Sequence, residues 1–277
     1  MTSKKDAVEV LEATSRTFFV SIVDLPPPLR EAVMSAYLSM RAIDEIEDHL
    51  TLDRGTKVLL LQDISQKLRA AIAGSELNHC LVTKSVYRNV LPEVTVRIRE
   101  WELLAPASIA PHLWSAISVM ADRMAYWASN GWRIRSEADL DRYTLSVAGA
   151  VGILLSDLWA WYDGTLTEKV QAVGFGRGLQ AVNILRNRAD DLARGVDFFP
   201  DGWNENDIQF YAKRNLGLAD RYVQALPPGP ALNFCRIPLA LAYATLEALA
   251  LGEPKLTRDA VMSVVRREQS LSFQNKG

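Results

Sequence analysis

The sequence predicts an all-α protein that forms one compact domain over residues 1–277. Apolar residues recur at helical spacing along almost the whole chain, and no segment shows the two-residue alternation of a half-buried strand between turn signals. No internal repeat, low-complexity tract or long linker marks a domain boundary. A chain of 277 residues is long for one domain, so its length alone leaves two domains open.

The first predicted helices follow from proline and glycine signals. Three consecutive prolines, Pro26–Pro28, precede a helix predicted over about residues 29–49, which carries several apolar residues. A second helix is predicted over residues 57–73, where Gly74 ends it. Loops therefore separate the first two long helices.

Capping residues set the later predicted helices. Ser136 followed by Asp139 forms a capping-box pattern that opens the helix containing Tyr143. Gly164 separates this helix from a long one over about residues 167–193. The prolines of residues 227–230 mark a loop before another apolar helix, and Thr257 is expected to cap the last helix.

Composition excludes several classes of protein. The 31 Lys and Arg residues are balanced by 33 Asp and Glu residues, so no nucleic-acid partner is expected. Cys80 and Cys235 are far apart in sequence, which argues against a disulfide scaffold or a cysteine metal site. The first ten residues are charged and lack the apolar core of a secretion signal. We therefore expect a cytoplasmic protein.

One stretch, residues 143–162, has nearly the length and apolarity of a membrane span. It also contains Asp157 and the glycines Gly149 and Gly152, and a charged segment precedes it. These features suit a broken helix in a protein core better than a lipid-facing helix. No transmembrane segment is predicted.

The chemistry begins at the end of the first long helix. Arg41, Asp44 and Asp48 are spaced by three and four residues, so they project from one helical face. Carboxylates on an otherwise core-forming helix are costly unless they are paired or hold a cation, and oxygen ligands one turn apart suit Mg²⁺. The alternative is a solvated acidic helix end with Arg41 in an intrahelical ion pair.

A second polar stripe lies on the helix predicted over residues 167–193. Its members follow steps of three, four and four residues: Gln180, Asn183, Asn187 and Asp191. Such a stripe makes a poor core and a good wall for a ligand, and Arg186 beside it can meet phosphate oxygens. An exposed face with an ion pair between Arg186 and Asp190 is the alternative. Together, the two stripes favour a site for a metal ion and a diphosphate.

Three stretches of the chain resemble the squalene and phytoene synthase family, in which two prenyl diphosphates are joined head to head. The first holds Ser15-Arg-Thr-Phe18 and, further on, Tyr37-x3-Arg41-x2-Asp44-x3-Asp48. The second and third are Tyr143-x3-Val147-Ala-Gly149-x-Val-Gly152 and Gln180-x2-Asn183-Ile-x-Arg186-Asn187-x3-Asp191. Their order and separation match the family from near residue 10 to about residue 200.

The resemblance implies a terpenoid-synthase helical bundle with a central cavity between two Asp-rich helices. It implies Mg²⁺ as cofactor, held by Asp44, Asp48, Asn187 and Asp191, and a prenyl diphosphate donor as substrate. Tyr143 is the candidate for orienting the diphosphate or assisting proton movement, beside Asp44, Asp48 and Asp191 as the other catalytic residues. The substrate-binding residues that it implies are Ser15, Thr17, Phe18, Tyr37, Arg41, Val147, Gly149, Gln180, Asn183, Arg186 and Tyr243.

The chain departs from the family pattern in one half of the site. Asn187 stands where the family has an aspartate, so one metal-binding charge is missing, although an asparagine oxygen can still be a ligand. Val196 and Phe198 stand where an Arg and a Tyr are common. A substrate with a single diphosphate would need less positive charge than two diphosphates.

Three functions therefore remain open. The first is head-to-head condensation to a squalene-, dehydrosqualene- or phytoene-like product. The second is transfer of one prenyl group to another acceptor, such as an aromatic small molecule. The third is a non-catalytic descendant that acts as a binding or assembly partner. An apolar product is compatible with peripheral membrane contact at its release, and no dinucleotide fingerprint supports a nicotinamide site.

Overall fold

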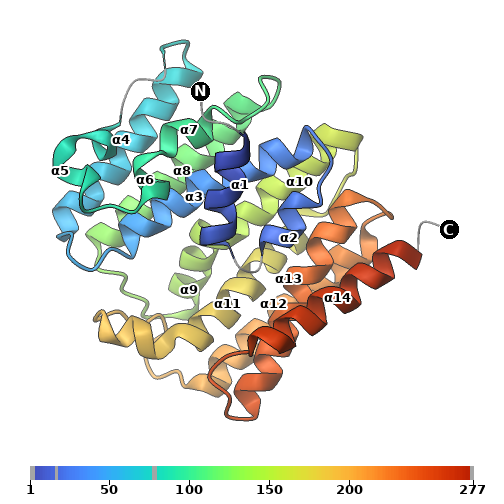
Figure 1. Ribbon diagram of the computed structural model, residues 1–277. Helices are drawn as coiled ribbons and strands as arrows, with labels where there is room; N and C mark the ends of the chain where they lie inside the picture. Colours follow the sequence, from blue (N-terminus) through green and yellow to red (C-terminus); the bar gives the residue numbers. More distant parts are fainter. Residues whose placement is uncertain (1–3, 16–17, 77–79, 275–277) are drawn as a thin grey trace. The chain divides into compact units, whose positions relative to one another are not determined.

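The computed structural model describes residues 4–15, 18–76 and 80–274, and every regular element in these ranges is a helix (Figure 1). This confirms the all-α prediction. The chain divides into two compact units, residues 1–132 and 133–277, which are described in turn. The prediction of a single domain with a central cavity stays a prediction.

The first unit is built on three long helices and several short ones. The long helices are α3 (Leu29–Glu47), α4 (Arg54–Ile72) and α8 (Ala110–Ser129); α4 packs along α8, and α3 packs on both α8 and the short helices α6 and α7. The remaining elements are α1 (Lys4–Thr14), α2 (Phe18–Val23), η1 (Leu81–Thr83), α5 (Ser85–Arg88), α6 (Glu93–Val96) and α7 (Ile98–Glu102). Because α3 contacts so many neighbours, more than half of its residues are buried.

The helix ends in this unit differ slightly from the predicted ones. Helix α3 ends at Glu47, two residues before the predicted end, and the Asp48 N–H donates to the Asp44 carbonyl at 2.8 Å. Helix α4 begins at Arg54, three residues early, because the Asp53 side chain caps it by accepting from the Thr56 N–H at 3.0 Å. Asp48 therefore lies at the helix cap and not within the last turn.

The second unit contains the long helix α11 (Lys169–Ala193), which packs along α12 and against α10, η2 and α13. Its other elements are α9 (Glu137–Thr144), the π-helical turn η2 (Leu145–Gly149), α10 (Ala150–Asp163), α12 (Glu205–Ala225), α13 (Pro230–Ala250) and α14 (Arg258–Gln274). The predicted capping box is present at Ser136 and Asp139, and Gly164 ends α10 in the left-handed region at φ 80°. The Thr257 hydroxyl accepts from the Ala260 N–H, as predicted for the last helix.

Glycines allow α11 to cross η2 and α10 closely. A Cβ atom on Gly152 would lie 2.0 Å from the Ala172 carbonyl oxygen, and one on Gly176 would lie 2.1 Å from the Ala148 carbonyl oxygen. These distances are far below van der Waals contact, so neither position accepts a side chain. The structure therefore shows that Gly152 serves a close helix crossing.

The helical stretch of residues 137–163 meets the length and composition of a membrane span, and half of its most apolar window is buried inside the protein. A π turn interrupts this stretch at η2, which agrees with the broken helix expected from the glycines. Core helices of soluble proteins pass the same test of length and composition. The absence of a transmembrane segment stays a prediction.

Glu102 gives the first unit a pH-dependent stability. Its side chain is 1% exposed and accepts from Arg99 Nη1 at 2.7 Å, while Glu102 Oε1 has no hydrogen-bond partner among the described residues. Burial raises the pKa of Glu102 from 4.5 to about 7, and Arg99 offsets only part of this rise. The folded state therefore binds the proton more tightly than the unfolded state.

We expect the stabilising effect of this proton to be complete below pH 4.5 and to be lost as the pH rises to about 7. Glu102→Gln should remove this pH-dependent change in the free energy of unfolding, which is on the order of 1–3 kcal/mol between pH 4.5 and about 7. Urea unfolding of both proteins at pH 5 and pH 8 measures it. Parallel pH curves for the two proteins would contradict the expectation.

Candidate functional site

The acidic face of α3 carries Arg41, Asp44 and Asp48. The Arg41 guanidinium donates to the Glu45 carboxylate one turn along, so the intrahelical ion pair of this arginine is with Glu45. Asp44 and Asp48 are both half-buried. Lys57 Nζ donates to the Glu47 carbonyl at 2.6 Å, which anchors the end of the helix where the two aspartates lie.

The pKa of Asp44 is raised because the positive charge of Arg41 does not offset the desolvation of the carboxylate. Burial raises its pKa from 3.8 to about 7; Arg41 lowers the pKa, and Asp48 and Glu45 raise it further. A divalent cation would reverse this balance, because it stabilises the ionised form. Asp44 and Asp48 therefore fit Mg²⁺, which binds through one or two carboxylates and substrate phosphates.

The residues predicted to bind substrate near the N-terminus lie close to α3. Ser15 Oγ accepts from the Phe18 N–H at 3.1 Å and so caps α2, which is the ordinary role that such a residue has. The Tyr37 hydroxyl donates to the Thr14 carbonyl at 3.3 Å, and the Tyr37 and Phe18 rings are 6.0 Å apart. Thr17 lies outside the described residues.

The polar stripe of α11 is tied together by Arg186. Arg186 Nη2 donates to Asn183 Oδ1 at 2.5 Å, and Arg186 Nε donates to Asn187 Oδ1 at 3.1 Å. Asn187 Nδ2 also donates to Asn183 Oδ1, at 3.2 Å. No ion pair between Arg186 and Asp190 is among those of the described residues. Arg186 is exposed, and partial desolvation lowers the pKa of its guanidinium.

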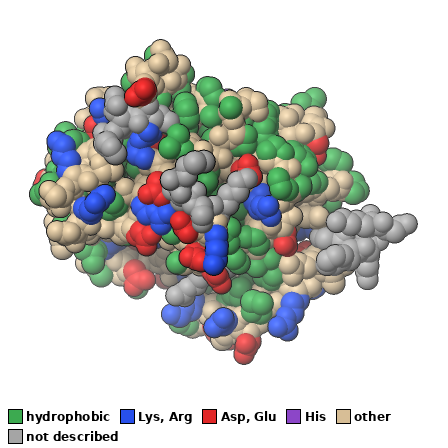
Figure 2. All heavy atoms as spheres, turned by 45° about the horizontal axis from the view of Figure 1, so that its top comes forward, with side chains coloured by type: hydrophobic (Ala, Val, Ile, Leu, Met, Phe, Trp, Pro, Cys, Tyr) green, Lys and Arg blue, Asp and Glu red, His purple; other side chains and the backbone are tan. Residues whose placement is uncertain are grey.

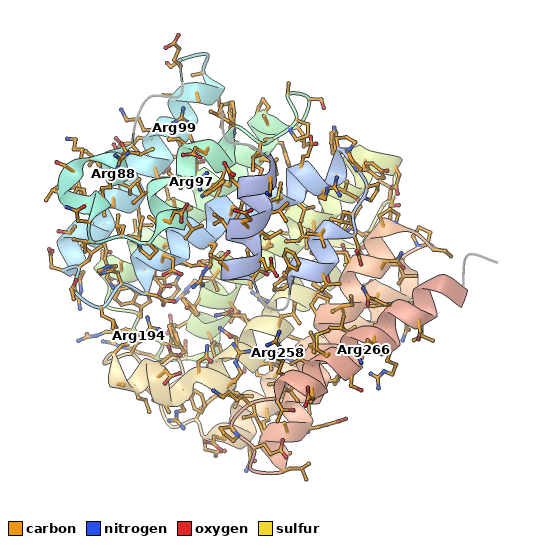
Figure 3. The ribbon with its side chains drawn as sticks, in the orientation of Figure 1. Arg88, Arg97, Arg99, Arg194, Arg258 and Arg266 are labelled. Carbon is orange, nitrogen blue, oxygen red and sulfur yellow. The ribbon has the colours of Figure 1, made fainter. Side chains whose placement is uncertain are left out.

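Asp191, the acidic end of this stripe, is 8% exposed. Arg194 Nη2 donates to Asp191 Oδ1 at 2.5 Å, and Figure 3 labels Arg194 just beyond the end of α11. Arg194 was not among the predicted site residues, although its spacing of three residues from Asp191 is the usual signal of a helical ion pair. Gln180, the first member of the stripe, is half-buried.

Tyr143 lies at the end of α9 and is 3% exposed. Its ring stacks on Phe198, with ring centroids 4.5 Å apart and an interplanar angle of 20°. Val147, one turn later in η2, is half-buried, and a Cβ atom on Gly149 would meet Leu145 and Val173 side chains at 3.2 Å. The segment after α11 thus places an aromatic ring on the predicted catalytic tyrosine.

Within the described residues, no three His, Cys, Asp or Glu side chains are close enough together to form a complete metal site. The predicted ligands form two pairs, Asp44 with Asp48 at the end of α3 and Asn187 with Asp191 on α11. Each pair offers the two oxygen ligands that Mg²⁺ commonly takes from protein when substrate phosphates supply others.

Comparison with known proteins identifies the family. Residues 11–210 match the squalene/phytoene synthase family, a range that contains both polar stripes and Tyr143. The chain belongs to the squalene/phytoene synthase family.

Curated squalene synthases are the relatives found by sequence. The squalene synthase of Eremothecium gossypii is 30% identical over 93% of this chain and 64% of its own length. That of Schizosaccharomyces pombe is 31% identical over 87% of this chain and 58% of its own length. The human squalene synthase is 28% identical over 89% of this chain and 63% of its own length. The chain thus spans less than two thirds of each of these proteins.

Solved structures agree in fold. The complex of TcSQS with a ligand superposes with a TM-score of 0.77 at 21% identity, over 95% of this chain and 85% of that chain. A dehydrosqualene synthase in complex with a ligand superposes with a TM-score of 0.66 at 16% identity, over 98% of this chain and 96% of that chain. The helical fold of this family member is therefore that of squalene and dehydrosqualene synthases.

The departures from the family pattern have structural counterparts in this chain. At the position where the family has an aspartate, Asn187 joins an amide network with Asn183 and Arg186. Phe198 lies on Tyr143, and the neighbouring Phe199 ring is 3.7 Å from the Arg188 guanidinium carbon, so the segment that holds Val196 is anchored by aromatic contacts. In this half of the site, Asn187, Val196 and Phe198 stand where the family resemblance implied an aspartate, an arginine and a tyrosine.

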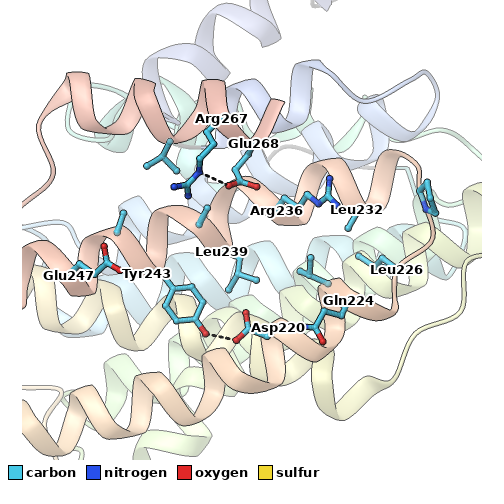
Figure 4. Close-up of a pocket in the computed structure, with 15 residues that line it drawn as sticks. Asp220, Gln224, Leu226, Leu232, Arg236, Leu239, Tyr243, Glu247, Arg267 and Glu268 are labelled. Atoms are coloured by element: carbon cyan, nitrogen blue, oxygen red, sulfur yellow. Dashed lines mark hydrogen bonds and ion pairs between the residues drawn. The ribbon is translucent and has the colours of Figure 1, made fainter. Parts of the chain in front are cut away.

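Tyr243 lies elsewhere in the second unit. It lines a cavity between α12, α13 and α14, and none of the other predicted site residues lines this cavity (Figure 4). Its hydroxyl donates to Asp220 Oδ2 at 2.5 Å. Burial raises the pKa of Tyr243 above its usual value, and the hydrogen bond to Asp220 adds to the rise. A contact of Tyr243 with substrate stays a prediction.

The surface carries no excess of one charge where Figure 2 shows it. Lys and Arg side chains on this face are interspersed with Asp and Glu side chains and with hydrophobic ones. This mixture agrees with the formal net charge of −2. This face therefore offers no broad positive surface to an anionic ligand.

Proposed function

We propose that this chain is a magnesium-dependent prenyltransferase that ionises an allylic prenyl diphosphate and condenses two prenyl groups head to head. Its membership in the squalene/phytoene synthase family and its likeness to curated squalene synthases support this. The observation that carries the proposal is the pair of half-buried carboxylates, Asp44 and Asp48, on one face of α3, where a cation would offset the desolvation that raises the pKa of Asp44.

Each residue has a role in the proposed reaction. Asp44 and Asp48 would hold Mg²⁺ on α3, and Asp191 and the amide oxygen of Asn187 would hold Mg²⁺ on α11. Mg²⁺ held there would supply positive charge to the leaving diphosphate. Arg41 and Arg186 supply donors to the same phosphate oxygens, since guanidinium groups match them geometrically.

The carbocation that remains must be kept from water, which requires an apolar wall. Tyr143 and Phe198, both almost fully buried and stacked, offer a π surface in the second unit that can steady a cation. The Tyr143 hydroxyl is the group that we assign to orienting the diphosphate or moving a proton. Loss of both diphosphates and two protons gives a dehydrosqualene- or phytoene-like product, whereas a squalene-like product loses both diphosphates and one proton and gains a hydride from a donor.

The test is incubation of the purified chain with Mg²⁺ and allylic prenyl diphosphates that contain two, three or four isoprene units. Pyrophosphate release and mass spectrometry of the extract, with and without NADPH, measure the reaction. We expect a hydrocarbon with twice the carbon number of one donor. Pyrophosphate release that gives only the monomeric alcohol in every reaction would contradict condensation.

The amide network on α11 favours a second candidate, transfer of one prenyl group to a different acceptor such as an aromatic small molecule. Asn183, Arg186 and Asn187 bond to each other without a carboxylate among them, so this part of the stripe has less capacity for metal ions than a pair of aspartates. Product that forms only when an aromatic acceptor is added would establish this candidate. A chain that neither binds nor consumes any prenyl diphosphate would instead be a non-catalytic family member.

Asn187→Asp tests the assignment of this position. We expect the concentration of Mg²⁺ needed for half-maximal activity to fall by roughly 10-fold, because a carboxylate replaces a neutral oxygen ligand. The new carboxylate also pairs with Arg186, so the arginine keeps a partner. A magnesium titration of both proteins measures the change. Superimposable titrations would place residue 187 away from the metal.

A double-mutant cycle tests whether α3 and α11 serve one diphosphate. Arg41→Gln and Arg186→Gln should each raise KM, and their effects on kcat/KM should be non-additive if both donors bind the same group. Additive effects would assign the two arginines to separate ligands.

The proposed cellular location is the cytoplasm, with membrane contact only where an apolar product leaves.

A further inference from the structure

The second unit contains a cavity of about 750 Å³ between α12, α13 and α14, outside the polar stripes described above (Figure 4). Helix α13 contributes a continuous stripe to its wall at steps of three and four residues, which begins at Leu232 and ends at Glu247. The volume lies in the range of pockets that hold a small organic ligand, about 300–1,000 Å³. The cavity therefore has room for more than a few water molecules.

One part of the wall is hydrocarbon. Leu226, Leu232 and Leu239 line the cavity and are each less than a tenth exposed, and Val223 and Val264 line it from α12 and α14. Apolar lining of this kind retains a hydrocarbon group because contact with it removes apolar surface from water. A ligand that fills the cavity must be apolar over much of its length.

Most polar groups in the lining already have partners. The Tyr243 hydroxyl donates to Asp220 Oδ2, and Arg267 Nε donates to Glu268 Oε1 at 3.2 Å; both contacts are drawn in Figure 4. Arg236 differs from them. Its Nη1 atom is shielded from solvent and has no hydrogen-bond partner among the described residues.

An unpartnered donor on a charged group is costly, and an acceptor placed in the cavity would recover the lost interaction. None of the three acidic lining residues is this acceptor among the described residues, and Glu268 already accepts from Arg267 Nε. Glu247 is eleven residues after Arg236 on the same helix, about 16 Å away along its axis. Asp220 accepts from Tyr243, which is itself seven residues, or about 10 Å, beyond Arg236.

We propose that this cavity binds an anionic amphiphile, whose carboxylate or phosphate head accepts hydrogen bonds from Arg236 and whose hydrocarbon body lies against Leu226, Leu232 and Leu239. The site does not depend on the proposed prenyl-transfer reaction. Its two requirements, a negative head and an apolar body, can be separated by the choice of probe.

The test is isothermal titration of the full chain with four probes: laurate, dodecyl phosphate, dodecanol and inorganic phosphate. We expect saturable binding of one equivalent of laurate or dodecyl phosphate per chain, at least 10-fold tighter than that of dodecanol or inorganic phosphate. Preference for one of the two anionic amphiphiles identifies the head group. Equal binding of dodecanol would overturn the role of the anion, and equal binding of inorganic phosphate would overturn that of the hydrocarbon.

Two variants locate the site. Arg236→Gln should weaken binding of the anionic amphiphile at least 10-fold, and Ala240→Phe should abolish it by filling the cavity from α13. Arg221→Gln is the matched control, because Arg221 is an exposed arginine on α12 that does not line the cavity, and it should change affinity less than 2-fold. Circular dichroism confirms that each variant is folded. Unchanged binding in folded Arg236→Gln would refute the proposal.

Discussion

Asp44→Asn is expected to lower kcat/KM by at least ~100-fold while making the metal-free protein more stable at pH 8. Activity falls because the amide removes a negative ligand from the proposed magnesium site. Stability rises because the pKa of Asp44 is about 7 in the folded protein and 3.8 in the unfolded one, so the stability that its proton provides below pH 3.8 is lost as the pH passes 7. Steady-state kinetics and thermal unfolding at pH 5 and pH 8, without Mg²⁺, measure the two effects.

The control for this variant is Asp122→Asn on α8. Asp122 forms a partly exposed ion pair with Arg69, and such pairs contribute about 0–1 kcal/mol. It should therefore alter neither activity nor the pH dependence of unfolding beyond this small amount. Full activity in Asp44→Asn would remove the metal assignment, and a lower unfolding temperature at pH 8 would contradict the electrostatic argument.

Gly176→Ala is expected to destabilise the second unit by about 3 kcal/mol or more. The added methyl carbon would lie 2.1 Å from the Ala148 carbonyl oxygen and 2.8 Å from the Gly149 amide nitrogen. These are backbone atoms, so α11 and η2 must move apart to accept the methyl group, and the packing along both elements is lost. Chemical unfolding measures the change in free energy.

Gly217→Ala on α12 is expected to have the opposite effect on the free energy of unfolding. No atom lies within 4 Å of the place that its Cβ would occupy, so the substitution should stabilise the helix by about 0.5–1 kcal/mol. Because both changes add the same methyl group within a helix, their difference isolates the close crossing. Equal effects of the two substitutions would show that the crossing does not limit side-chain size.

Local signals predicted much of the fold. Ser136, Gly164 and Thr257 end or begin helices where their side chains or backbone angles require it, and these effects involve only neighbouring residues. The long helices were likewise predicted from apolar spacing. The predicted end of α3 was two residues too late and the predicted start of α4 three residues too late. At α4 the difference arises because the Asp53 side chain caps polar residues that the apolar pattern does not mark.

Contacts between distant residues could not be predicted in this way. The stacking of Phe198 on Tyr143 joins residues 55 positions apart, and the backbone approach at Gly152 depends on where α11 passes. The presence of Gly152 in the sequence did not indicate that α11 passes there. The Asp44 carboxylate could be placed on a helical face from spacing alone, whereas its raised pKa depends on burial by the rest of the unit.

The π turn of η2 links Tyr143 to the glycines that follow it. A π turn is geometrically an α-helix with one residue inserted, so side chains before and after it differ in phase by about 100° from those of an uninterrupted helix. The direction in which Tyr143 points relative to α10 therefore depends on how many residues the turn at 145–149 contains, as well as on their identity. A substitution within this turn keeps the direction of the Tyr143 side chain relative to α10, whereas deletion of one residue would rotate it by about 100° about the helix axis.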